Sequence, residues 1–185
     1  SSDLMGAVVR TWWFLAYTLD PRTAVAGAMI NADLRWQIWE NGAIFQLGCR
    51  PQFFGCDTRD PHQVFRMEYE TTDPAPEGFY GGWWFFAFPI AQARHMPFPF
   101  FVRGDDVSFS LANDFRIVTL PGVVSFQESF TNKASPLTWY LDLRSHLAHH
   151  LSLPGKAVGW RQMQKMLVSF YLRTVLRFHY DSLSA

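Results

Sequence analysis

The chain has 185 residues, of which 49% are hydrophobic and 17% aromatic. A chain of this length can bury roughly 70% of its unfolded surface, so one domain can fold without disulfides or metals, and the apolar composition excludes a disordered chain. Lysine plus arginine and aspartate plus glutamate number 16 each, so the formal net charge is zero. No overall positive field is present to hold nucleic acid, which we exclude as a partner.

The first element expected is a helix over residues 4–19, an apolar run that Pro21 ends. The run is shorter than the ~20 residues that cross a bilayer and no basic segment precedes it, so it predicts a buried helix rather than a span or a signal peptide.

Cys49 and Cys56 have neither the spacing of a zinc site nor the density of a secreted disulfide scaffold. We expect free thiols and a cytoplasmic protein, with the inner face of the membrane as an alternative location.

The remaining elements follow from periodicity and turn residues. In chain order they are a strand at 23–31, a hairpin over 34–47 about Asn41-Gly42, an irregular excursion over 48–78, a strand at 81–88, a helical turn at 90–94, a helix at 105–113, strands at 116–120 and 123–126 about Pro121-Gly122, and helices at 136–151 and 156–180. The expected fold class is α/β, with a mixed sheet flanked by helices and two helices at the C-terminus.

An ordered set of motifs fills residues 79–127. Gly82-Trp83-Trp84 is followed by a Pro-rich turn at 97–101, by Gly104-Asp105-Asp106 and by Thr119-Leu120-Pro121-Gly122. This order resembles the GT-A glycosyltransferases of family 2, in particular the galactofuranosyltransferases of bacterial cell-wall polysaccharide biosynthesis. With the small-residue strand at 25–29, Lys133 and the helix segment 140–144, the resemblance covers about residues 5–150.

The resemblance implies a fold and an activity. The chain would be the C-terminal, acceptor-side portion of a GT-A fold, a single domain over 1–185 in which about 1–150 is the catalytic-domain remainder and 151–185 a C-terminal helix. The enzyme would transfer a sugar, with inversion, from a nucleotide-sugar donor to a glycan or lipid-linked acceptor. The half that binds the nucleotide would precede Ser1, so we expect this fragment alone to be inactive.

The resemblance also assigns site residues. An inverting displacement needs one carboxylate to take the proton of the acceptor hydroxyl, and this base is Asp106. Asp105 would shape the pocket or touch the acceptor, and two adjacent like charges raise the pKa of one of them. Trp83, Trp84 and Arg144 would bind the acceptor, although strand alternation lets only one indole face a given groove. The alternative is that the two acids cap a helix and that both tryptophans are core residues.

Departures from the family pattern concern the metal site. The resemblance implies a divalent metal, Mn²⁺ or Mg²⁺, in the full-length enzyme, but Gln127 stands where the family has a histidine ligand. The adjacent Glu128 could substitute for it. Gly104 also replaces an expected tryptophan. These departures favour a rival interpretation, a non-catalytic degenerate module that binds glycan or a protein partner through its aromatic groove.

Two helices carry further signals. His146, His149 and His150 have the spacing of one helix face, which suits either a metal or, as we favour, a partly exposed structural face. The last helix is expected to pack in the core, while its basic and aromatic residues would also permit peripheral membrane contact. An exposed apolar face left by the missing half would promote homo-oligomers. Hydrolase, dehydrogenase and NTPase motifs are absent from the sequence.

Overall fold

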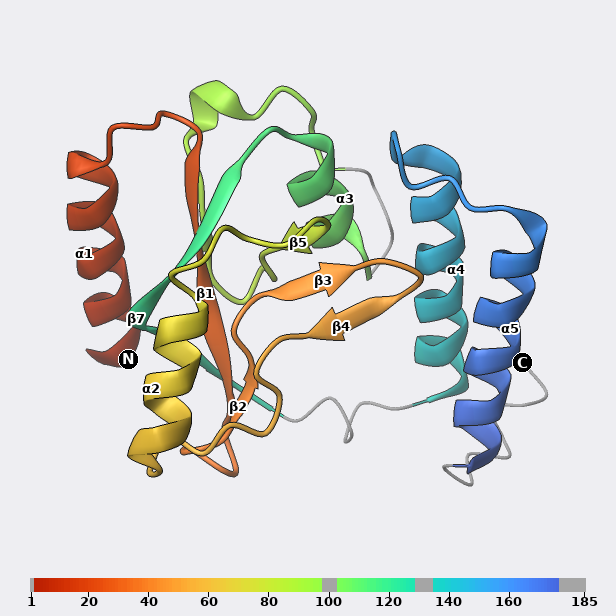
Figure 1. Cartoon of the computed structure of the whole chain (residues 1–185), viewed down its shortest axis with the longest axis horizontal. Coiled ribbons are helices and arrows are strands. Elements are labelled where there is room, and N and C mark those ends of the chain that lie inside the picture. The colour runs from red at the N-terminus through yellow and green to blue at the C-terminus, as the bar shows by residue number, and fades with distance from the viewer. Residues whose placement is uncertain (1, 98–102, 129–134, 177–185) are drawn as a thin grey trace.

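The computed structural model describes residues 2–97, 103–128 and 135–176 (Figure 1). Within these residues the chain is a mixed α/β structure with a four-stranded mixed sheet, a three-stranded antiparallel sheet and five α-helices. The expected class, α/β with a mixed sheet and two C-terminal helices, is therefore confirmed. Lys133 and most of the Pro-rich turn at 97–101 lie outside the described residues.

Strand β1 (Thr23–Asn31) is the centre of the larger sheet. All nine of its residues are buried, because its small and apolar side chains fit between neighbours on both sides. Along one edge it pairs in parallel with β7 (Arg116–Gln127). Along the other edge it pairs antiparallel with β6 (Phe86–Ala87) and with β2 (Ile38–Glu40). The predicted strand is confirmed with its bounds.

Strand β7 is continuous where two strands and a turn were expected. Pro121 and Gly122 remain within it, and the pairing with β1 shifts register opposite Ala26 to Ala28. Gly122 has a φ of 74°, a left-handed conformation that suits glycine at a bulge. The Pro-Gly signal therefore marks a bulge, and the turn prediction is wrong.

Helix α1 (Ser2–Tyr17) lies against one face of this sheet, over β7 and β1 (Figure 1). The helix prediction is confirmed, but the expectation that it is buried is wrong. Among its described side chains only Ala7 and Thr11 are buried, while Trp12 and Trp13 are 63% and 52% exposed. A helix that is apolar on every side can bury only the side that meets the sheet.

The segment after β2 does not form the expected hairpin. Beyond Asn41-Gly42 the chain leaves the first sheet, and β3 (Ala43–Phe45) pairs with β4 (Cys49–Pro51) and β5 (Phe79–Tyr80) in the second sheet. The dipeptide is thus a link between two sheets.

The stretch expected to be irregular contains helix α2 (Pro61–Glu70). Asp60 begins it, because its side chain accepts the backbone N–H of His62 at 2.9 Å and Pro61 occupies the first turn. The prediction of an irregular excursion over 48–78 is wrong at this helix and at the short strand β4.

Between β5 and β6 the chain forms a turn, so the expected strand at 81–88 is reduced to the two-residue strand β6. The helical turn at Ile90–Gln92 and helices α3 (Asp105–Ala112) and α4 (Pro136–Ser152) confirm their predictions. Helix α5 (Trp160–Leu176) confirms the last helix up to the end of the described residues. Figure 1 shows the β3–β4 hairpin reaching α4, with α5 outside it.

Candidate functional site

Asp106 lies in the first turn of α3 with its carboxylate directed at backbone amides. Its Oδ1 accepts the N–H of Val107 at 2.8 Å, and the N–H groups of Asp106 and Trp83 also donate to the carboxylate. Burial raises the pKa of Asp106 to about 6, the amide bonds oppose that rise, and the charge of Asp105 adds to it. At neutral pH Asp106 is therefore mostly ionised and still basic enough to accept a proton.

Three further side chains gather around Asp106 from three different strands. They are Glu40 at the end of β2, Cys49 on β4 and Tyr80 on β5, and with Asp106 we name them the buried acid cluster. Burial is the main cause that raises the pKa of each of the other three, and the negative charge of Asp106 adds to it. The Tyr80 hydroxyl donates a hydrogen bond to the Cys49 sulfur. The two sheets and α3 thus converge on one site.

Glu40 is the second carboxyl of the cluster. It is 5% exposed, and its Oε1 has no hydrogen-bond partner among the residues that the structure describes. Burial first, and the charge of Asp106 second, raise the pKa of Glu40 to about 8. At neutral pH Asp106 is consequently ionised and can accept a hydrogen bond, whereas Glu40 is neutral and can donate one. Two carboxyls whose pKa values are shifted apart in this way are typical of the acid and base of an active site.

The sequence prediction included Asp106 but not its neighbours. Glu40 lies two residues beyond the buried Ile38 on the same strand, so it occupies the inward face where an apolar side chain is expected. This mismatch was the one local signal for Glu40. Tyr80 and Cys49 carry no comparable signal, because only the pairing of β5 and β4 with β3 brings them to the site.

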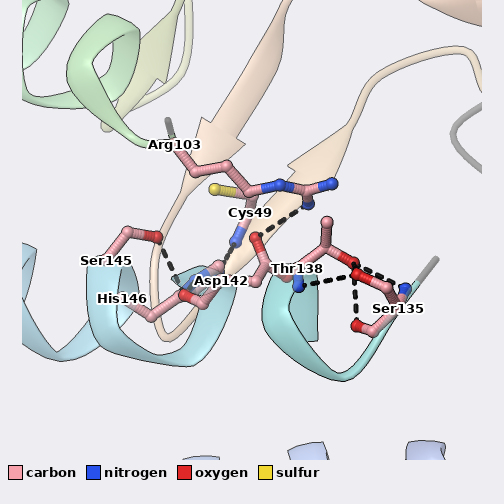
Figure 2. A network of polar contacts seen from close by, with 7 residues as sticks. All are labelled: Cys49, Arg103, Ser135, Thr138, Asp142, Ser145 and His146. Atoms are coloured by element: carbon pink, nitrogen blue, oxygen red, sulfur yellow. Dashed lines mark hydrogen bonds and ion pairs between the residues drawn. The ribbon is translucent and has the colours of Figure 1, made fainter. Parts of the chain in front are cut away.

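A hydrogen-bond network fixes the β3–β4 hairpin to α4 (Figure 2). The backbone N–H of Cys49 donates to His146 Nε2 at 3.1 Å, and His146 Nδ1 lies 2.7 Å from the carbonyl oxygen of Asp142. Nε2 must accept and Nδ1 must donate, which requires the neutral imidazole. Burial lowers the pKa of His146 and favours the same form. The histidine thus acts as a structural link that holds Cys49 in place.

The three histidines of α4 are buried, so the expectation of a partly exposed face is wrong. Phe45 lies between their rings, with centroid distances of 5.0 to 5.9 Å. Burial and the two neighbouring histidines lower the pKa of His149 to about 4. No set of three or more His, Cys, Asp or Glu side chains in the described part of the chain could hold a metal ion.

Gly104 occupies a position with no room for a side chain. It has a φ of 91°, and a Cβ there would lie 2.7 Å from His149 Nε2 and 2.9 Å from Ser145 Cβ. Arg103, just before α3, forms an ion pair at 3.4 Å with Asp142 of α4 (Figure 2). Side chains of α4 therefore fill the space that a tryptophan at position 104 would need.

Trp83 and Trp84 point in different directions from their turn. The indole N–H of Trp84 donates to the carbonyl oxygen of Gly27 at 3.1 Å and so attaches the turn to β1. Trp83 is 41% exposed and lies edge-on to Phe109, with 5.7 Å between ring centroids.

Trp83 also lines an apolar groove of about 520 Å³, together with Phe86, Phe88, Ile90, Ala93, Met96, Pro97 and Phe109. Because the backbone N–H of Trp83 donates to Asp106, the groove and the buried acid cluster are adjacent. A larger hollow of about 760 Å³ lies along the chain from Glu70 to Phe79 and carries neither Asp106 nor Glu40 among the residues that line it.

Two further residues predicted for the site, Asp105 and Arg144, lie on α3 and α4. Asp105 is half-buried in the first turn of α3, and its carbonyl oxygen accepts the Ser108 hydroxyl at 3.0 Å. Arg144 is half-buried on α4, two positions from Asp142 and therefore roughly on the opposite side of that helix.

The proposed metal ligands do not form a ligand set. Gln127 ends β7, and its side-chain N–H donates to Ser125 Oγ at 3.0 Å, while Glu128 beside it is exposed. One amide and one carboxylate fall well short of the roughly six oxygen ligands that Mg²⁺ takes. Among the residues that the structure describes, Gln127 and Glu128 alone do not fit a divalent metal, and we assign no chemical step to one.

Comparisons with protein-family models and with curated proteins found no match for the chain. None of the helices in the described ranges is long and apolar enough to cross a membrane. A functional assignment must therefore rest on the geometry of the buried acid cluster and its groove, together with the motif order.

Proposed function

We propose that the chain is the acceptor-side portion of an inverting, family 2-like GT-A glycosyltransferase that transfers a sugar from a nucleotide-sugar donor to a glycan or lipid-linked acceptor. One observation carries the proposal: the buried carboxyls of Asp106 and Glu40, with pKa values of about 6 and about 8, interact electrostatically next to a groove that exposes Trp83. The order of motifs supports it independently. The donor nucleotide enters the proposal from the resemblance alone.

The chemistry assigns one role to each side chain. The acceptor hydroxyl oxygen attacks the anomeric carbon of the donor, its proton passes to the Asp106 carboxylate, and the bond from that carbon to the leaving diphosphate breaks. Glu40, which is neutral at pH 7, donates a hydrogen bond toward the acceptor and adds no second negative charge. The exposed face of Trp83 contacts the apolar C–H face of a sugar ring.

Transfer from nucleotide sugars to oligosaccharide acceptors by the full-length parent enzyme, followed by mass spectrometry, tests the role of Asp106. Asp106→Asn should lower kcat at least a hundredfold, the lower end of the effect of general base catalysis, with KM for the acceptor little changed. In the wild type kcat/KM should rise through about pH 6, the pKa of Asp106.

Asp114→Asn is the matched control, because Asp114 follows α3, is exposed and pairs with Arg22 at 3.1 Å. It should leave transfer unchanged. Full transfer activity of the Asp106→Asn enzyme would refute the proposal.

The rival function is a non-catalytic module that binds glycan in the apolar groove. The incomplete ligand set at Gln127 favours it. It would be supported if the full-length parent turns over no nucleotide sugar, while an oligosaccharide still shifts the fluorescence of the wild type and not that of Trp83→Ala. Turnover that depends on Asp106 would exclude it.

A further inference from the structure

Helix α5 exposes an apolar face on the outer side of the molecule. Met166, Phe170 and Thr174 are its buried residues, and Phe170 contacts His146 of α4 with 5.0 Å between ring centroids. The opposite side carries large apolar side chains that are 49% to 73% exposed, namely Trp160, Val168, Tyr171, Leu172 and Leu176. Figure 1 shows α5 outside α4 at one end of the molecule.

The charge of α5 is entirely positive. Arg161 and Lys165 lie among the exposed apolar residues, Arg173 is exposed beside them, and the helix contains no Asp or Glu. This combination separates α5 from the other helices that expose apolar residues. Helix α2 also exposes two aromatic rings but carries Glu68 and Glu70, and α1 exposes a broad apolar face with Arg10 as its only basic residue.

We infer that α5 is a docking surface for a bilayer that contains anionic phospholipids. Tryptophan and tyrosine favour the headgroup region, the aliphatic residues enter the acyl boundary, and the long stems of Arg161 and Lys165 let their charges reach the lipid phosphates. The helix would lie in the membrane plane, since no described helix can cross a bilayer.

Charge complementarity favours lipid over a second copy of this chain. A two-fold contact between copies through α5 would place like charges of two helices against each other. An anionic bilayer instead offers many opposite charges along the whole length of the helix. The inference does not depend on glycosyl transfer, because it uses no residue of the buried acid cluster or the apolar groove.

Vesicle co-sedimentation tests the surface, with vesicles of phosphatidylcholine alone and of phosphatidylcholine with one third phosphatidylglycerol. The chain should sediment with the anionic vesicles and lose binding at high salt. Arg161→Gln/Lys165→Gln should weaken binding about thirtyfold, because each cation near an anionic surface contributes about fivefold. Trp160→Ser/Leu172→Ser should weaken binding to the same vesicles.

Arg59→Gln/Arg66→Gln is the matched control. It removes the same charge from exposed positions in and before α2, and it should bind like the wild type. Circular dichroism should show that every variant is folded, since all six positions are exposed.

Three results would overturn the inference. The first is the absence of binding to anionic vesicles. The second is equal binding to neutral and anionic vesicles that the α5 variants leave unchanged, which would point to the broad apolar face of α1. The third is a dimer in size-exclusion chromatography that the α5 variants dissociate, with no vesicle binding.

Discussion

Replacing Glu40 by Gln should make folding stability much less dependent on pH. Glu40 is 5% exposed and its pKa is raised from 4.5 to about 8. The folded state therefore keeps its proton at pH values where the unfolded chain has lost it. Its favourable contribution is complete below about pH 4.5 and is lost as the pH rises through about 8.

The size of the effect follows from the shift. Each pKa unit corresponds to about 1.4 kcal/mol, so the wild type should lose about 4 kcal/mol of unfolding free energy through Glu40 between about pH 4.5 and pH 8. Glutamine is neutral at every pH and nearly the same shape. Near pH 5 the two proteins should therefore differ little, while at alkaline pH Glu40→Gln should be the more stable by several kcal/mol.

Urea unfolding followed by tryptophan fluorescence, repeated across this pH range, measures the difference. Glu70→Gln is the control, because Glu70 is exposed and pairs with Arg66 on the surface of α2 at 2.6 Å. A surface pair of this kind contributes about 0.5 kcal/mol at most, so its pH profile should follow the wild type. Parallel profiles for the wild type and Glu40→Gln would refute a buried, protonated Glu40.

Three further predictions concern the surroundings of the site. Gly104→Ala should lower unfolding free energy by at least about 2 kcal/mol in urea titration, because the residue has a left-handed backbone and the new Cβ meets His149; unchanged stability would contradict the observed packing. Burial raises the pKa of Cys49 to about 12, so a disulfide reagent at mildly alkaline pH should modify it far more slowly in the folded than in the urea-unfolded chain. Asp60→Ala should cost about 1 kcal/mol of stability by removing the cap of α2, whereas Asp60→Asn, which can still accept the N–H of His62, should cost less.

The sequence predicted correctly those helices and strands whose structure depends mainly on the residues within the segment itself. Nine apolar or small residues in succession predicted β1, and the acids before an apolar helix predicted α3. The same kind of signal was available for α2, since Asp60-Pro61 is a cap followed by a first-turn proline. We missed it because the helix buries only Met67 and so lacks a strong apolar period.

Pairing between distant segments could not be predicted in this way. Asn41-Gly42 has the residues of a hairpin turn, but the strands on its two sides join different sheets. Pro121-Gly122 has the residues of a turn, but pairing with β1 on both sides keeps it as a bulge within one strand. In each case tertiary contacts outweigh a local preference. The buried acid cluster depends on the same distant pairings, which is why sequence patterns pointed to Asp106 alone.

Asp60 offers a comparison for the two interpretations of Asp106, as a helix cap and as a catalytic base. Asp60 is an aspartate that caps a helix at the surface, and its hydrogen bonds to Gln63 and to the backbone of His62 lower its pKa. Asp106 also accepts amide N–H groups at a helix start, yet burial raises its pKa to about 6. Capping alone favours an exposed carboxylate with a lowered pKa, since the helix dipole and amide donors stabilise the anion. The fold therefore keeps at α3 a carboxylate that is costly to bury, and the charge of this carboxylate raises the pKa of a second buried carboxyl, Glu40. That cost has no structural purpose in a cap, and it is what an acceptor of protons near neutral pH requires.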